Sequence, residues 1–234
     1  MKEPRIFLNA DVGERPEALA DGSEEALLRL LDWANIACGG HAGDDHSMRQ
    51  VSALCRSLGV QVGAHPGYPD RERFGREELG LPPEAIAALV FEQVRALGRI
   101  AGQVRHVKPH GALYNTAVRD PSVAAAIATG AARWSRDVTL VGLAGSRMIE
   151  VWRGQGFVVV EEAFADRRYL PDGTLRPRRF PDALITAPKE AAAQARRLAA
   201  TAGTLSVHSD TPGALDIARA VREALDRVGT RRRL

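Results

Sequence analysis

The sequence predicts one (β/α) barrel with about seven strands, and three observations support this fold class. Short apolar runs alternate strictly with longer helical patterns along the 234 residues, as in a parallel sheet covered by helices. Potentially reactive side chains directly follow five of the predicted strands. No linker or change of composition divides the chain, so residues 1–234 are expected to form a single barrel domain.

Seven short runs of β-branched and apolar residues are predicted to be the strands. They are residues 5–10, 33–38, 60–65, 105–109, 138–143, 157–164 and 204–210. Because the runs are separated by helical patterns, the strands are expected to be parallel.

Seven helices are predicted between and after these strands. They are residues 23–32, 45–58, 83–102, 121–135, 145–155, 188–202 and 212–227. A capping residue or a first-turn proline marks several starts, at Ser23, Asp120-Pro121, Ala187-Pro188 and Thr211-Pro212. Gly59, Gly102 and Gly156 stand where left-handed helix ends are expected.

The reactive side chains favour a closed barrel over an open sheet. They stand in "LNADVGE", "IACGGHAGD", "GAHPGYPD", "VKPHGALYN" and "VHSDTPG". Groups from many strand ends converge when those ends form a ring, whereas a doubly wound sheet gathers them near one switch point. Residues 66–82 and 165–187, rich in Arg, Pro and Gly, are expected to be loops over the barrel mouth.

Composition and charge argue against several other classes of protein. The net charge is +3 and aromatic residues make up 5%, without the basic clusters and aromatic platforms that bind nucleic acid. No apolar run reaches the roughly 20 residues of a membrane span, and the N-terminus turns polar too early for a signal peptide. We therefore expect a cytoplasmic protein, with residues 231–233 as a solvated basic tail. Neither a Walker A sequence nor a G-x-G-x-x-G loop is present.

The stretch "HVKPH" is predicted to form one wall of a site inside the barrel. In an extended strand, His106, Lys108 and His110 point to the same side because side chains alternate. Pro109 argues against a helical pair of metal-binding histidines here. A buried lysine needs a carboxylate partner or a lowered pKa. Asp11, at the end of the first strand, is the best candidate partner.

Four histidines stand at or just after strand ends and are expected to share one functional site. They are His41, His65, His110 and His208, whereas His46 is expected at the surface. Carboxylate and imidazole groups at strand ends can hold a divalent metal, and Asp11, His41 and His65 would be its ligands. No compact metal motif is present, so a metal is possible but not indicated by a motif.

For three other residues the sequence leaves two possible roles open. Asp44 and Asp210 precede predicted helices, so each is either a helix cap or a member of the site. Cys38 beside a histidine could be a nucleophile, but no cysteine-hydrolase sequence surrounds it.

Seven sequence blocks together resemble the LamB/YcsF family. The blocks are "LNADVGE", "ANIACGGHAGDDHSMR", "GVQVGAHPGYPDRERFGRE", "VKPHGALYN", "LVGLAGS", "EAFADRRYLPDGTLRPR" and "VHSDTPGAL", in order over almost the whole chain. The residues that match the family pattern are Asp11, Glu14, His41, Asp44, His65, Lys108, His110, Tyr114, Asn115, Asp166, Arg167, His208 and Asp210.

The resemblance implies a fold and an activity. Family members are seven-stranded barrels related to glycoside hydrolases and deacetylases. They are the A subunits of a bacterial 5-oxoprolinase complex, which opens 5-oxoproline to L-glutamate at the expense of ATP together with subunits B and C. ATP would then be handled jointly with the partner subunits, because this chain has no phosphate loop of its own.

On this basis roles can be assigned as hypotheses. Catalytic roles are expected for Asp11, His65, Lys108 and His110, with Asp11 or His65 as general base and Lys108 and His110 stabilising the oxyanion. Substrate contacts are expected from Asn9, Glu14, His41, Asp44, Arg76, Tyr114, Asn115, Arg167, His208 and Asp210. Two alternatives stay open: a metal-dependent deacetylase or amidohydrolase acting on an N-acetyl sugar or related amide, and a substrate-binding subunit without catalysis.

The chain departs from the family pattern at three positions in these blocks. Ala10, Gly40 and Ser209 stand where the family usually has cysteine, phenylalanine and glycine. The loss of the phenylalanine at Gly40 is expected to widen the space beside His41 and to affect substrate preference.

Overall fold

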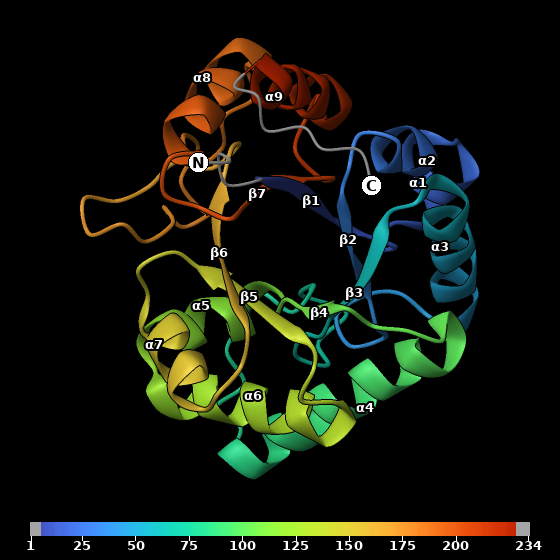
Figure 1. Cartoon of the computed structure of the whole chain (residues 1–234), viewed down its shortest axis with the longest axis vertical. Helices are drawn as coiled ribbons and strands as arrows, with labels where there is room; N and C mark the ends of the chain where they lie inside the picture. The colour runs from blue at the N-terminus through green and yellow to red at the C-terminus, as the bar shows by residue number, and fades with distance from the viewer. Residues whose placement is uncertain (1–5, 228–234) are drawn as a thin grey trace.

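Seven parallel strands close into a barrel in the computed structural model, which describes residues 6–227. The strands are β1 (Phe7–Val12), β2 (Trp33–Ala37), β3 (Gln61–His65), β4 (His106–Val107), β5 (Thr139–Leu143), β6 (Val159–Phe164) and β7 (Thr204–His208). Each strand pairs with the next one along the chain, and β7 pairs with β1. The predicted barrel and its seven strands are confirmed (Figure 1).

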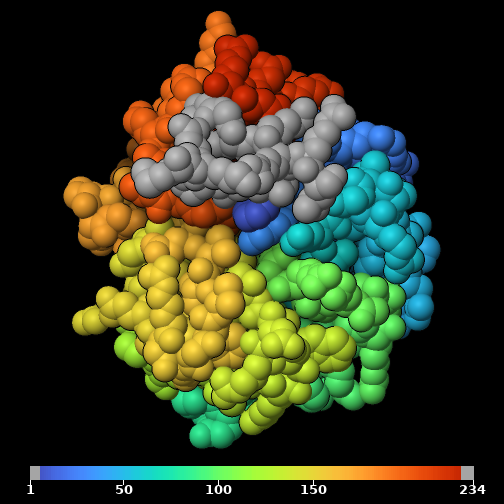
Figure 2. Space-filling view, in the orientation of Figure 1, coloured from blue at the N-terminus to red at the C-terminus, as the bar shows by residue number. Residues whose placement is uncertain are grey.

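The helices of the described residues lie outside the barrel (Figure 1). They are α1 (Pro16–Ala20), α2 (Ser23–Leu28), α3 (Asp45–Leu58), α4 (Pro83–Ala101), α5 (Gly111–Arg119), α6 (Pro121–Trp134), α7 (Arg147–Gly154), α8 (Pro188–Leu198) and α9 (Ala214–Arg227). Successive parts of the chain follow one another around the molecule, as the order of colours in Figure 2 shows. This is the arrangement that right-handed strand–helix–strand units produce.

Helices α1 and α5 were not predicted from the sequence. Helix α1 has only five residues, too few for a periodic pattern. Helix α5 begins at Gly111, where φ is +51°, directly after the short β4. The apolar residues of α5 that become buried are Ala112, Leu113, Tyr114 and Ala117. They are too few to reveal a helical pattern beside a proline and a glycine.

The helix starts and ends agree with the sequence in most places. Asp120 caps α6 by accepting a hydrogen bond from the amide of Ser122, and Pro188 is the first residue of α8. The predicted cap at Ser23 is wrong, because Gly22 occupies that position. Helix α3 ends at Gly59 with φ of +71°, as expected for a left-handed stop.

Strand β4 is shorter than its predicted span of residues 105–109, because Pro109 has no N–H to donate to a neighbouring strand. The extended backbone still continues beyond the strand. The amide of Lys108 donates to the carbonyl of Ala64 at 3.0 Å, and that of His110 donates to Pro66 at 2.8 Å. These two bonds carry the alternation of side chains past the end of β4, so Lys108 and His110 both remain on the inner side.

The interior of the barrel is polar, unlike the apolar layers that fill most barrels of this type. In β1, Leu8, Ala10 and Val12 belong to the hydrophobic core, while Asn9 and Asp11 point to the barrel interior and hydrogen-bond there. Further buried polar side chains come from the other strands: Asn35, His106, Glu162, Thr204 and Ser206. The hydrophobic core therefore lies between the sheet and the helices, and the barrel axis is available for a site.

Among residues 6–227, no helix is both long and apolar enough to cross a membrane. The predicted basic tail at residues 231–233 and the first residues of the N-terminus lie outside the described part of the chain.

Candidate active site

Lys108 lies at the centre of the barrel with two carboxylates around its ammonium group. Its Nζ is 3.0 Å from an oxygen of Asp11 and 3.0 Å from an oxygen of Glu162. It also donates to Oγ of Ser206 at 3.0 Å and is 3.4 Å from Oδ1 of Asn9. The predicted pairing of Lys108 with Asp11 is confirmed.

Lys108 and Asp11 each stabilise the charged form of the other. Burial alone would lower the pKa of Lys108, but the carboxylates of Asp11 and Glu162 outweigh it, and the pKa is raised. Burial would raise the pKa of Asp11, but His65 and Lys108 hold it well below the ordinary value. Lys108 is therefore a permanent cation, and Asp11 is a permanent anion and a weak base.

The donors of Lys108 are fully used. An ammonium group has three N–H bonds, and Asp11, Glu162 and Ser206 accept them. Lys108 is also almost completely buried. This arrangement makes Lys108 a residue that holds Asp11 in place, rather than one with a donor ready for a substrate.

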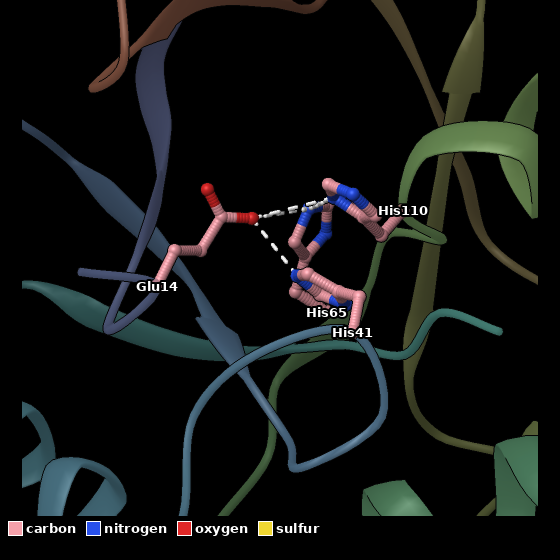
Figure 3. A group of neighbouring side chains, drawn as sticks. All are labelled: Glu14, His41, His65 and His110. Carbon is pink, nitrogen blue, oxygen red and sulfur yellow. Dashed lines mark hydrogen bonds and ion pairs between the residues drawn. The ribbon is translucent and has the colours of Figure 1, made fainter. Parts of the chain in front are cut away.

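Beside this network, one carboxylate and three histidines converge (Figure 3). The group comprises Glu14, His41, His65 and His110, and one ligand atom from each lies within 4.8 Å of the others. Nε2 of His41 is 2.9 Å from Oε1 of Glu14, Nδ1 of His110 is 3.3 Å from the same oxygen, and Nε2 of His65 is 3.7 Å from it. These four side chains could hold a metal ion.

The composition of this group differs from the ligand set expected from the sequence. His41 and His65 belong to it as expected, but Glu14 takes the place given to Asp11, and His110 is added. Asp11 lies 3.3 Å from Nε2 of His65 and is bound to Lys108 instead. Glu14 was expected as a substrate contact rather than as a metal ligand, because it follows the end of β1, where the path of the chain depends on Gly13 with φ of +70°.

The four side chains of this cluster differ in the direction of their pKa shifts. Burial lowers the pKa of His41 to about 3. Burial also lowers the pKa of His110, although Glu14 opposes the shift. His65 behaves differently, because Asp11 outweighs burial and its pKa is raised. Glu14 remains ionised, since its hydrogen bonds with His110 and His41 outweigh the effect of burial on its pKa.

His208 forms a separate pair with Asp166 at the end of β7. Nδ1 of His208 is 2.9 Å from Oδ1 of Asp166, and the other oxygen of Asp166 accepts from the amide of His208 and the hydroxyl of Thr211. The ring of His208 stacks on Phe164. Asp166 thus fixes Nδ1 as the protonated nitrogen and directs Nε2 to the other side of the ring. Asp11 and His208 are register partners across the β1–β7 seam.

The two long loops meet at Asp210. Arg76 of the 66–82 loop and Arg178 of the 165–187 loop bind the same oxygen of Asp210, at 2.6 Å and 2.8 Å. Arg167 interacts electrostatically with Asp210 and both of these arginines. Burial lowers the pKa of its guanidinium group to about 10. This cluster holds three guanidinium groups near two carboxylates, those of Asp210 and Asp166, and Asp166 is already bound to His208. It is suited to bind an anion at the barrel mouth.

A cavity of about 440 Å³ opens next to Glu14 and His41. Its other walls include Leu19, Arg71 and Phe74. This volume lies within the roughly 300–1,000 Å³ typical of small-molecule sites.

Three candidate residues have positions that differ from a direct substrate contact. Asn115 is exposed on α5. Asp44 caps α3, although it also borders the cavity. Tyr114 is buried and donates to Glu162, 3.1 Å away, so it supports the lysine network from outside. His46 is exposed, as expected.

Cys38 does not have the properties of a nucleophile. Its thiol is buried and donates to the carbonyl of Ile36, and burial raises its pKa to about 12. A thiol is a weak nucleophile in that state.

The expectation of extra space at Gly40 is wrong. A Cβ atom there would lie 2.5 Å from Oε1 of Gln93 and 2.6 Å from the carbonyl of Gly67. Gln93 donates to that carbonyl and accepts from the amide of Gly67. The side chain of Gln93 on α4 fills the position, so no enlarged pocket results beside His41.

Glu24 is a further buried carboxyl group that the sequence did not reveal. It accepts a hydrogen bond from the amide of Gly13, directly before Glu14. Burial raises its pKa to about 7. Glu24 therefore fixes the turn that presents Glu14.

The raised pKa of Glu24 predicts a pH dependence of stability. The carboxyl group ionises near its ordinary pKa of 4.5 in the unfolded chain and near 7 in the folded one, so the folded state binds more protons between them and stability falls as pH rises. Glu24→Gln is expected to remove this fall in the free energy of unfolding, which amounts to about 3 kcal/mol. Urea unfolding at pH 4.5 and pH 8 measures it, with the exposed Glu17→Gln as control. Equal pH slopes in wild type and Glu24→Gln would contradict the assignment.

Comparison with known proteins gives a consistent result. The model of the LamB/YcsF family matches residues 6–233. The A subunit of 5-oxoprolinase from Chloroflexus aggregans is 47% identical, with 96% of each chain covered. That of Methylococcus capsulatus is 44% identical, with 94% of this chain and 92% of the relative covered.

Solved structures agree with these relatives. The lactam utilization protein of Thermus thermophilus has a TM-score of 0.88 and 41% identity, covering 96% of this chain and 97% of the other. A family 4 carbohydrate esterase of Streptomyces lividans has a TM-score of 0.53 at 12% identity, covering 98% of this chain and 91% of the other. The second likeness concerns the fold alone.

Proposed function

This chain belongs to the LamB/YcsF family, and from this premise we propose that it opens 5-oxoproline to L-glutamate as the A subunit of an ATP-dependent complex. The observation that carries the proposal is the buried carboxylate–lysine–histidine centre beside a small-molecule cavity. The curated relatives are named as A subunits of 5-oxoprolinase, and the similar crystal structure is named for lactam utilization.

The substrate has two recognisable groups, an anionic carboxylate and a neutral lactam. The arginine cluster at Asp210 offers guanidinium groups for the carboxylate, since each has five N–H donors and only part of them bind Asp210. The lactam would then lie toward the histidines. Arg76 and Arg167 were among the expected substrate contacts, as alternatives to Asn9, Tyr114 and Asn115 for the carboxylate, and Arg178 lies with them.

Ring opening requires water to add to the lactam carbonyl carbon. The C–N bond then breaks, its electron pair goes to nitrogen, and a proton must reach that nitrogen. We assign this proton transfer to Nε2 of His208, because Asp166 holds the opposite nitrogen. Asp11, with its lowered pKa, supplies a fixed negative charge rather than acting as the general base.

ATP couples to this step through the amide oxygen. Transfer of the γ-phosphoryl group to that oxygen releases ADP and makes the carbon more electrophilic. One water opens the ring and a second releases phosphate, so one ATP and two waters give glutamate, ADP and phosphate. We assign the nucleotide site to the partner subunits B and C, because this chain has no phosphate loop.

Glutamate release from 5-oxoproline and ATP tests the proposal. The chain is assayed alone, with subunits B and C, and as Asp11→Asn in the complete complex. We expect turnover only in the complete complex and a loss of about 10²-fold or more in Asp11→Asn. The exposed Asp137→Asn, at the opposite end of the barrel, is the control.

Three outcomes would contradict the proposal. The first is full turnover by the partners without this chain. The second is unchanged turnover in Asp11→Asn, which would indicate a binding subunit without catalysis. The third is hydrolysis of N-acetyl sugars by the isolated chain without ATP, which would indicate a deacetylase.

A further inference from the structure

The histidine cluster has more hydrogen-bond acceptors than donors. Nδ1 of His65 lies 2.8 Å from the carbonyl oxygen of Lys108, and Nε2 of His110 lies 2.9 Å from that of Phe74. A carbonyl oxygen only accepts, so these two nitrogens carry the hydrogens. In the neutral rings, Nε2 of His65 and Nδ1 of His110 then present lone pairs to each other at 2.9 Å.

Glu14 adds a third acceptor at the same point (Figure 3). Its Oε1 is 3.3 Å from Nδ1 of His110 and 3.7 Å from Nε2 of His65. A proton on Nε2 of His65 would remove the repulsion between the two facing histidine nitrogens. The lone pair on Nδ1 of His110 would still face the carboxylate of Glu14. A cation that accepts electron pairs from all three atoms removes every one of these repulsions.

The charge balance of the barrel interior also calls for a cation. Asp11 and Glu162 are buried against one ammonium group, that of Lys108, and a third carboxylate, that of Glu14, lies against the histidines beside them. Among the described residues, Asp166 is bound to His208 and Asp210 to two arginines. With the imidazoles neutral, as metal ligands must be, the excess of two negative charges equals the charge of one divalent ion.

The distances fit a first-row transition metal. Ligand atoms at about 2.0–2.1 Å from a tetrahedral Zn²⁺ lie roughly 3.3 Å from one another. The separations are 2.9 Å from His41 to Glu14, 2.9 Å from His65 to His110, 3.3 Å from His110 to Glu14 and 3.7 Å from His65 to Glu14, and all four ligand atoms lie within 4.8 Å of one another. Three imidazoles and one carboxylate favour zinc-like ions over Mg²⁺ or Ca²⁺.

The surrounding backbone is shaped to hold the rings in place. A Cβ at Gly67 would lie 2.6 Å from Nδ1 of His41, and one at Gly75 would lie 2.7 Å from Cβ of His41 and 3.2 Å from Cδ2 of His110. The rings of His41 and His110 stack at 3.5 Å. The carbonyls of Lys108 and Phe74 are the outer hydrogen-bond partners that orient metal-binding histidines.

We propose that Glu14, His41, His65 and His110 bind one divalent transition-metal ion of the zinc class. Glu14 and His41 also line the cavity, so the ion would be reached from the side where a small molecule enters. Such an ion supplies a Lewis acid for a carbonyl oxygen, a role that rests on the proposed function, whereas the binding itself does not.

Metal binding by the isolated chain tests the proposal without any assay of turnover. The protein is purified without a histidine tag, its metal content is measured, and the chelator-treated form is titrated with Zn²⁺ and Co²⁺. We expect one ion per chain and the visible absorption of Co²⁺ bound by nitrogen and oxygen. His65→Gln and His110→Gln are expected to weaken binding by more than about 100-fold, beyond the loss of an outer partner.

Two controls keep the result interpretable. His46→Gln removes an exposed histidine outside the cluster and is expected to bind normally. Glu14→Gln is an additional ligand variant. Circular dichroism of each variant distinguishes a loss of metal binding from a loss of the fold. Absence of binding by the folded wild-type chain, or equal affinity in folded His65→Gln and wild type, would overturn the proposal. Stoichiometric binding by the chain, together with a complete complex that does not turn over 5-oxoproline, would support this proposal while contradicting the proposed function.

Discussion

Replacing Lys108 with methionine is expected to lower the free energy of unfolding by about 3–5 kcal/mol, because Asp11 and Glu162 then remain buried without their shared cation. Methionine keeps most of the volume, so the loss reports the charge rather than a cavity. Turnover of the complete complex is expected to fall by about 10²-fold as Asp11 shifts from its position. Urea unfolding and the glutamate assay measure the two effects.

The control for this variant is the exposed Lys189→Met, which is expected to change neither quantity. The double variant Lys108→Met/Asp11→Asn removes one of the two unpaired charges and is expected to recover part of the lost stability, though not the activity. If the double variant were less stable than Lys108→Met by the full cost of Asp11→Asn alone, the two residues would not be coupled.

His208→Gln is expected to lower kcat of the complete complex by about 10²–10⁴-fold, the usual contribution of a general acid or base. Stability should change little, because glutamine can retain one of the contacts to Asp166. Asp166→Asn is expected to lower kcat by less, with KM almost unchanged, since the ring of His208 stays stacked on Phe164 but loses its fixed orientation.

Comparing kcat with stability distinguishes chemistry from structure in these variants. His208→Gln is expected to lower kcat without a matching fall in the free energy of unfolding, whereas Asp137→Asn keeps both at wild-type values. An unchanged kcat in folded His208→Gln would assign the proton transfer to another group.

The sequence predicted the barrel and much of its centre for a physical reason. Side chains alternate along a strand, so Asn9 and Asp11 had to share a face, as had His106 and Lys108. Ring closure then brings β1 opposite β4, which is why Asp11 could be identified as the partner of Lys108.

The residues that could not be predicted depend on register or on loop paths. In β6, Glu161 and Glu162 are adjacent, and only the pairing of Glu162 with Thr204 shows which of them faces the axis. Asp166 and Arg178 lie in a loop whose path is set by tertiary contacts. The filled space at Gly40 required knowledge of Gln93, which lies on another helix.

The polar interior of the barrel limits how this protein can change during evolution or design. An apolar core tolerates many exchanges of similar volume, but each inner side chain here is a donor or acceptor for another one. Asn35 illustrates this: it donates to Asn9 and Asp11 and accepts from His106. Any single exchange at these positions leaves a neighbour unsatisfied, so viable variants of the barrel axis must arise as matched sets, while the solvent-exposed faces of the outer helices remain free to vary one residue at a time.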